Sequence, residues 1–240
     1  MLAQLARDGA ELRNAATDLD LPVPTCPGWS VRDAVLHTGE VYAHKATIVE
    51  NDLFEPPDPW PPAWDIGDPT DWFDEQLHRV IEALRARDPA TRVWTWYPPE
   101  QNVGFWVRRM MQETVIHRAD VESASSRQPP IPDEVAVDGI DELIERMLCS
   151  DDPDFYEGTP PGRGERVAIT AAVSAWTITL GPAVASFTRV AETDVDVAVE
   201  GDAGSLLLAV WNRLPYSAVT ATGDEAALAS LQALVAAATQ

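Results

Sequence analysis

The chain has 240 residues, with 17 Lys or Arg against 39 Asp or Glu, so its formal net charge at pH 7 is -22. A chain this acidic repels phosphate backbones and anionic lipid surfaces, which argues against nucleic-acid binding and membrane binding. Apolar residues make up 45% of the chain, enough to predict a globular protein with a sizeable core. No apolar run is long enough to span a bilayer.

The N-terminal segment and the cysteines predict a cytoplasmic protein. Residues 1–16 are amphipathic and include acidic side chains, unlike a signal peptide. Cys26 and Cys149 are the only cysteines, which argues against a disulfide scaffold and is typical of a reducing compartment. Cys26 lies beside no basic residue that would favour its thiolate, and we interpret both cysteines as structural.

The first half of the chain is predicted to be helical. Apolar residues at helical spacing predict a first helix over residues 2–19, which the prolines at positions 22, 24 and 27 end. A second helix is predicted from Val31 to about Asn51. Ser30 is its candidate N-cap, and Asp33 completes a capping box in which the usual glutamate is replaced by the shorter aspartate.

Two loops and two further helices complete this half. Residues 55–69 contain six prolines and are predicted to form a long loop, after which Thr70 caps a third helix. A second loop over residues 88–102 precedes a fourth helix, from Val103 to Ser125. We therefore predict an antiparallel four-helix bundle over residues 1–127.

The second half has a different pattern. Residues 125–132, SSRQPPIP, form a predicted boundary, and a helix is expected over 133–148. Alternating apolar residues predict several strands within 165–200. The remaining segments are predicted to be a helix, a strand and a helix, in that order, at 202–215, 217–223 and 224–238. The predicted fold class is α+β, with residues 133–240 forming a small α+β domain around an antiparallel sheet.

Three polar residues fall on helix faces where a bundle core should be apolar. They are His37 on the second helix and Glu113 and His117 on the fourth. Glu113 and His117 are four residues apart, so they lie one above the other on one face. Together with a histidine from a facing helix they predict a three-ligand metal site with an open position. Two histidines and one carboxylate suit Zn(II) first, and Fe, Mn or Ni less well.

The same residues also allow ordinary structural roles. A Glu-x-x-x-His pair is often only a surface pair, and a core histidine is more often hydrogen-bonded than a ligand. We interpret His44 as a core histidine and predict that His78 is solvated. Asp120 is either a partner that orients His117 or a surface residue, and the surface role is favoured. Tryptophans near the ends of the bundle are interpreted as packing residues, namely Trp60, Trp64, Trp94, Trp96 and Trp106.

Two segments resemble the signature segments of the mycothiol-dependent maleylpyruvate isomerase family. They are CPGWSVRDAVLHTGEV (26–41) and RRMMQETVIHRADVESA (108–124). The resemblance covers the chain and implies a DinB-like metal-binding bundle followed by a domain similar to sterol-carrier proteins. In the family, the histidine of P-G-W-x-V-x-D-x-x-x-H and both ends of E-x-x-x-H bind zinc, which implies His37, Glu113 and His117 here. The mycothiol-using members are actinobacterial.

The resemblance also implies a mechanism. Mycothiol serves as the thiol cofactor, and zinc lowers the pKa of a bound thiol or water. The thiolate adds to an activated double bond, the carbon–carbon bond rotates, and elimination gives the trans isomer. Arg213 matches the region where the family places a substrate-contacting arginine, although as a cation near a helix C-terminus it also complements the helix dipole. Arg108, Arg109 and Arg118 flank the motif. One of them is a candidate ligand contact, and most are expected to solvate the helix surface.

The sequence thus predicts a zinc-dependent, mycothiol-using enzyme that acts on a small electrophilic, anionic substrate by cis–trans isomerisation. Two alternatives stay open: a mycothiol S-transferase that uses the same site, and a non-catalytic protein that binds a metal or another ligand. The expected partners are a small-molecule substrate and a low-molecular-weight thiol, with no nucleic acid and no membrane. No oligomeric state is predicted.

Overall fold

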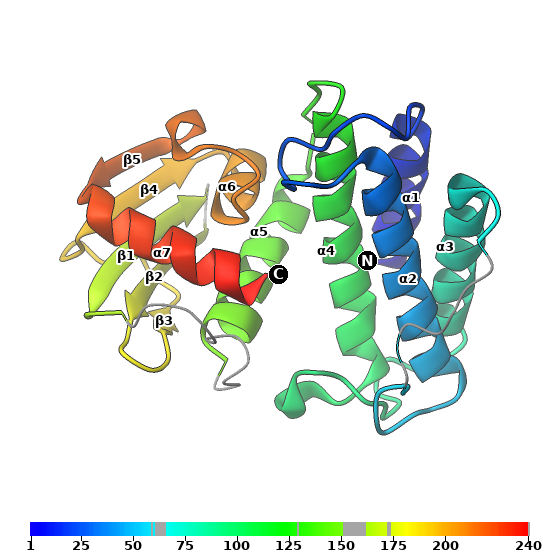
Figure 1. Ribbon diagram of the computed structural model, residues 1–240. Helices are drawn as coiled ribbons and strands as arrows, with labels where there is room; N and C mark the ends of the chain where they lie inside the picture. The colour runs from blue at the N-terminus through cyan, green and yellow to red at the C-terminus, as the bar shows by residue number, and fades with distance from the viewer. Residues whose placement is uncertain (59, 61–65, 129, 151–161, 172–173, 240) are drawn as a thin grey trace. The chain divides into compact units, whose positions relative to one another are not determined.

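The structure is a computed structural model that describes the chain except for residues 59, 61–65, 129, 151–161, 172–173 and 240. The chain divides into two compact units, Met1–Pro129 and Pro130–Gln240 (Figure 1). Helices come first and a five-stranded sheet with further helices follows, which confirms the α+β fold class. Among the described residues, no helix combines the length and the apolar character needed to cross a membrane.

The first unit is a bundle of four helices that lie side by side in Figure 1: α1 (Leu2–Ala15), α2 (Val31–Glu50), α3 (Pro69–Arg85) and α4 (Val103–Ser123). α2 packs against α3 and α4, and α1 packs against the same two helices. Large side chains from all four helices form the core and are almost completely buried, among them Leu5, Leu12, Tyr42, Ile48, Phe73, Leu84, Trp106 and Met110.

α1 ends four residues earlier than predicted. After Ala15 the chain turns, and the backbone carbonyls of Leu19 and Leu21 accept hydrogen bonds from the amides of Arg32 and Val31. These carbonyls therefore pair with the start of α2 instead of continuing the helical ladder. This pairing leads the chain into α2 and positions the first half of that helix.

The N-termini of α2 and α3 are capped by side chains. The predicted capping box is confirmed: Asp33 N–H donates to Ser30 Oγ at 3.3 Å, and Ser30 N–H donates to Asp33 Oδ2 at 2.7 Å. The hydrogen bonds from Ser30 hold the pKa of Asp33 below its usual range. For α3 the predicted cap, Thr70, is wrong. Asp68 is the N-cap, because it accepts from two backbone amides of the first turn and the following proline is favoured at the first helical position.

α2 and α3 approach each other closely at Gly39. A Cβ atom built on Gly39 would overlap the six-membered ring of Trp72, which is itself almost completely buried. Glycine at this position is thus required by space, and the flat indole ring covers the backbone of α2 directly.

A buried charge cluster joins α1 to α4. Arg118 Nη1 lies 2.6 Å from Asp8 Oδ1, and Arg118 Nε lies 2.9 Å from Glu122 Oε1. Gln4 Nε2 donates to the second oxygen of Asp8 at 2.7 Å. Asp8 and Glu122 are both buried and Arg118 is largely so. Arg118 is therefore not one of the flanking arginines that solvate the helix surface, because two acids from two helices surround its guanidinium.

The second unit contains α5 (Asp133–Glu142), a π-helical continuation (Leu143–Leu148), and a sheet in the order β3-β2-β1-β4-β5. The strands are β1 (Glu165–Ala171), β2 (Ser174–Leu180), β3 (Ser186–Thr188), β4 (Val197–Gly201) and β5 (Thr220–Gly223). The sheet is mixed, whereas an antiparallel sheet was expected. β1 and β4 are parallel, because residues 189–196 carry the chain from the end of β3 back to the start of β4.

Two further helices complete this unit: α6 (Ala203–Val210) and α7 (Glu225–Ala238), which lies across the sheet in Figure 1 and contacts β1 and β4. α6 is shorter than predicted. Asn212 adopts a left-handed backbone conformation with φ 57°, and the amides of Arg213 and Leu214 fold back onto the carbonyl of Leu208. Arg213 consequently lies in the turn that follows α6 and not on the helix itself.

Candidate metal centre

Three potential ligands converge in the first unit from two facing helices. His37 projects from α2, and Glu113 and His117 project from α4. Glu113 Oε1 lies 3.6 Å from His37 Nε2 and 3.2 Å from His117 Nε2. One ligand atom from each of the three residues lies within 4.8 Å of the other two. The structure thus brings together the three residues that the helix faces single out.

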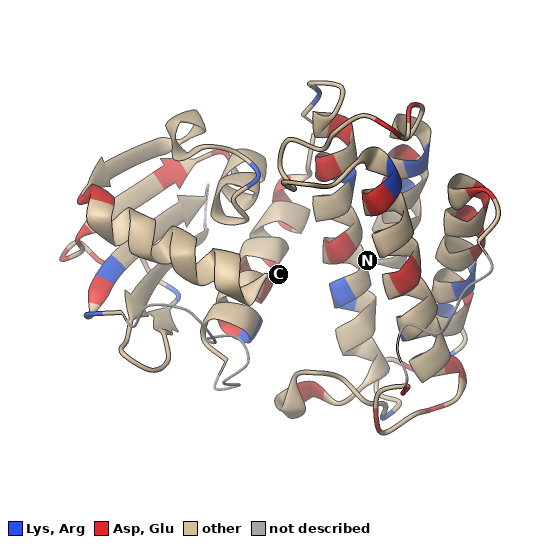
Figure 2. Ribbon diagram, in the orientation of Figure 1, with Lys and Arg blue, Asp and Glu red and all other residues tan. Residues whose placement is uncertain are grey.

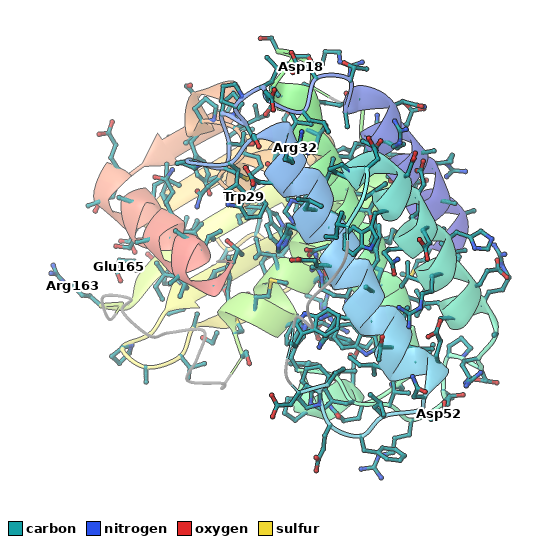
Figure 3. The ribbon with its side chains drawn as sticks, turned by 45° about the vertical axis from the view of Figure 1, so that its right-hand side comes forward. Asp18, Trp29, Arg32, Asp52, Arg163 and Glu165 are labelled. Carbon is teal, nitrogen blue, oxygen red and sulfur yellow. The ribbon has the colours of Figure 1, made fainter. Side chains whose placement is uncertain are left out.

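The local sequence explains this convergence. Glu113 and His117 are one helical turn apart, so both face the same direction from α4. Trp29, which is labelled in Figure 3, precedes α2. It packs against both imidazoles, with its ring centroid 4.9 Å from that of His37 and 6.1 Å from that of His117. The capped start of α2 fixes the position of His37, and the indole limits the rotation of both histidine rings.

A hydrogen bond with Asp120 fixes the orientation of the His117 ring. Asp120 Oδ2 lies 3.0 Å from His117 Nδ1, and Thr25 Oγ1 donates to the other oxygen of Asp120 at 2.7 Å. The side chain of Asp120 is 0% exposed. The favoured surface role for Asp120 is therefore wrong. A carboxylate on Nδ1 favours the imidazole tautomer whose Nε2 is free to bind a metal.

The surroundings of Glu113 and His117 shift the pKa values of both side chains. Burial acts to raise the pKa of Glu113, but hydrogen bonds with His117 and His37 and the charge of Arg109 outweigh it and hold this pKa well below its usual range. Burial lowers the pKa of His117, yet hydrogen bonds with Asp120 and Glu113 raise it to about 9. A metal ion that binds here must displace that proton. Two imidazole nitrogens and a carboxylate oxygen form a donor set that fits Zn(II).

Replacing Asp120 by asparagine is expected to weaken metal binding by about 10- to 100-fold, because His117 loses the carboxylate that orients its ring. The comparison is a competition titration of zinc against a chromogenic chelator. Asp71→Asn, an exposed position in the first turn of α3, is the matched control and should bind as the unmodified protein does. Equal affinities for the two variants would show that Asp120 does not support the site.

Two cations next to these residues were missed as site components. Arg109 is buried, and its Nη2 lies 3.1 Å from Glu113 Oε2. Its spacing of four residues before Glu113 is the signal that could have found it, since residues at this spacing share a helix face. Lys45 lies two turns beyond His37 on α2, and the charges of Glu113 and Arg109 both act on it. No pattern within α2 alone reveals this proximity.

The remaining residues singled out from the sequence have ordinary environments. His44 is a buried core histidine whose pKa burial lowers to about 3, and its Nδ1 lies 2.7 Å from Lys45 Nζ. His78 is exposed, as predicted. Neither cysteine forms a disulfide, and burial raises the pKa of Cys149 to about 12. Trp64 lies outside the described residues.

Arg213 belongs to the second unit. It is partly buried, and its Nη1 donates to the backbone carbonyl of Trp211 at 3.0 Å. Its role as a substrate contact stays a prediction.

Comparisons with known proteins cover almost the whole chain. Residues 2–122 match the family model described as the mycothiol maleylpyruvate isomerase N-terminal domain, and residues 134–230 match that of the corresponding C-terminal domain. A crystal structure of a mycothiol-dependent maleylpyruvate isomerase shares the fold, with a TM-score of 0.63 at 12% identity over 92% of this chain and 91% of the other. A mutant of a mycothiol-dependent maleylpyruvate isomerase gives 0.59 at 13% identity over the same shares. No curated protein matches.

Proposed function

Because the chain belongs to the mycothiol maleylpyruvate isomerase family, we propose that it is a metal-dependent enzyme that uses mycothiol to isomerise a small, unsaturated, anionic substrate. The metal is proposed to be zinc, held by His37, Glu113 and His117. We place the reaction in the reducing cytoplasm, where a thiol cofactor stays reduced.

The main support for this proposal is that the Nε2 atoms of His37 and His117 both lie near the same oxygen of Glu113. A protein that only binds an apolar ligand has no need of such a set. His37 and Glu113 have side chains 39% and 18% exposed, so the donor atoms lie near the surface of the first unit and not in its closed core. A small thiol and a substrate can therefore reach them.

The protein groups have separate tasks in this scheme. When bound, zinc supplies a Lewis acid that lowers the pKa of a thiol beside it. Asp120 keeps the proton of His117 on Nδ1, and Thr25 in turn fixes Asp120. Trp29 covers one side of both imidazoles and excludes water there. Hydrogen bonds with His117 and His37, together with the charge of Arg109 beside its second oxygen, hold the pKa of Glu113 low, so this carboxylate stays ionised despite its burial.

The chemistry is addition followed by elimination. The mycothiol sulfur forms a bond to one carbon of the activated cis double bond, and the electron pair of that bond passes to the adjacent carbonyl. Rotation about the resulting single bond and expulsion of the sulfur restore the double bond in the trans geometry. The thiolate returns unchanged, so the reaction needs no oxidant or reductant and consumes no thiol.

The test is to incubate zinc-loaded protein with mycothiol and maleylpyruvate and to follow both the substrate and the free thiol. The proposal expects the trans isomer to form at constant thiol concentration. A stable thioether with loss of thiol would instead identify an S-transferase that uses the same residues. If neither product forms with zinc-loaded protein, the proposed isomerase activity is wrong, and a binding role would remain.

We also propose that Arg213 contacts the anionic substrate. Replacing it by alanine is expected to raise KM by about 10- to 100-fold, the loss that follows when one hydrogen bond between charged groups is removed. Arg163→Ala is the matched control, since Arg163 is an exposed arginine of the same unit (Figure 3). Steady-state kinetics on the two variants decide the matter, and equal KM values would exclude this role for Arg213.

A further inference from the structure

Lys45 is the only lysine in the chain, and it lies inside the first unit. Its ammonium is 4.8 Å from the ring centroid of Trp106, which shows that the side chain extends from α2 toward α4. The charges of Glu113 and Arg109, both on α4, act on it. Lys45 is therefore a neighbour of the candidate metal centre, although it contributes no ligand to it.

Lys45 lacks an acidic partner within the part of the chain that the structure describes. Its contacts there are His44 Nδ1 at 2.7 Å and the face of Trp106. An ammonium has three donor hydrogens, so this arrangement leaves donors available. This isolation is unusual in a protein with 39 acidic residues, which outnumber the basic ones in both units (Figure 2). A partly buried cation that forms no direct ion pair is costly, and an anion beside it reduces that cost.

The indole of Trp106 offers no competing donor. Trp106 is 0% exposed, and its indole N–H already donates to the backbone carbonyl of Trp94 at 2.8 Å. The His44 ring contacts Lys45 and also the indoles of Trp60 and Trp94, and burial lowers its pKa to about 3, which keeps this ring uncharged. Lys45 is consequently a group that can donate a charged hydrogen bond to a ligand in this environment.

The distance to the metal centre matches a short ligand. Lys45 follows His37 by eight residues, which is about 12 Å along α2 at a rise of about 1.5 Å per residue. Helical side chains lean toward the N-terminus, so the ammonium lies closer to His37 than this. A small dicarboxylate can thus place one end near the three candidate ligands and its far carboxylate near Lys45.

We propose that Lys45 is a substrate-binding residue that receives the far carboxylate of a small dicarboxylate whose other end lies at His37, Glu113 and His117. This inference rests on the proposed function for the identity of the site. It names the substrate class by charge: a dianion with its carboxylates at opposite ends, preferred over a monoanion that lacks the far carboxylate.

The test is to titrate the zinc-loaded protein, without mycothiol, with fumarate, whose carboxylates lie at opposite ends, and with crotonate, which has the same trans geometry and lacks the second carboxylate. Tryptophan fluorescence reports binding, because Trp106 lies against Lys45. Lys45→Met is expected to weaken fumarate binding by about 10- to 100-fold and to leave crotonate binding unchanged. Lys45→Arg should retain most of the affinity for fumarate. Arg32→Met, a change at an exposed cation of the same helix (Figure 3), is the control and should bind as the unmodified protein does.

A second measurement uses the unmodified protein and so does not depend on the folding of a variant. An amine-reactive reagent labels only Lys45 and the N-terminal amine, and mass spectrometry distinguishes them. Fumarate should protect Lys45 and not the N-terminus. Equal fumarate affinity in Lys45→Met and the unmodified protein would overturn the inference, as would labelling of Lys45 that fumarate does not slow. Fumarate binding that depends on Lys45, without turnover, would support the inference and count against the proposed isomerase activity alone.

Discussion

Replacing His37 by alanine is expected to lower the affinity for zinc by more than about 100-fold and to abolish turnover with mycothiol. A residue that only orients a ligand already contributes about 10- to 100-fold, so loss of a ligand should exceed that range. Removal of His37 leaves Glu113 and His117 from a single helix, and these two cannot enclose an ion from both sides. Metal analysis after dialysis, with the competition titration described for Asp120, gives the affinity.

The fold should survive this change. The His37 side chain is 39% exposed and packs against the rings of Trp29 and His117, so the metal-free variant should melt within a few degrees of the metal-free parent. His78→Ala removes an exposed histidine from α3 and serves as the matched control, with full metal content expected. If His37→Ala retains one zinc per chain, the three residues are not the metal site and the proposed function loses its basis.

Replacing Asp8 by alanine is expected to destabilise the first unit by about 3 kcal/mol, at the lower end of the range for breaking a buried ion pair. The change leaves the Arg118 guanidinium with a single acidic partner, Glu122, in a buried position. It also leaves the amide of Gln4 without its acceptor. Since α1 and α4 are joined through this cluster, α1 should detach more easily.

Urea denaturation followed by circular dichroism measures this loss. The control is Asp74→Ala, which removes one partner of the exposed pair between Arg13 and Asp74 and should cost less than about 1 kcal/mol. Asp8→Asn retains an acceptor for Gln4 and is expected to fall between the two. Equal midpoints for Asp8→Ala and Asp74→Ala would mean that the buried cluster adds nothing to stability.

The sequence predicts well the features that lie within one helix. The phase of α4 places Glu113 and His117 on one face, and the capping box of α2 is visible in Ser30 and Asp33, because both patterns need only local spacing. The P-G-W segment identifies His37 as the third member. The structure agrees with each of these placements, while the binding of a metal stays a prediction.

Features that depend on contacts between elements were missed. Asp120 and Lys45 have local sequences typical of solvated residues, and their roles follow from partners on other segments, namely Thr25 and Trp106. The direction of β4 was missed for the same reason, since alternation of apolar residues is identical in parallel and antiparallel strands. The cap of α3 shows a local ambiguity, because Asp68 and Thr70 are both good N-cap residues and the proline between them decides.

The contact between Gly39 and Trp72 imposes an order on evolutionary change. Any side chain larger than hydrogen at position 39 overlaps the indole, so such a change is tolerated only after position 72 has acquired a smaller residue. A smaller residue at 72 alone leaves a void between α2 and α3. Each single step is therefore unfavourable, and the two positions should vary together or stay fixed. α2 also carries His37 and Lys45. A pair of substitutions at positions 39 and 72 would therefore also change the position of the helix that supplies these two side chains.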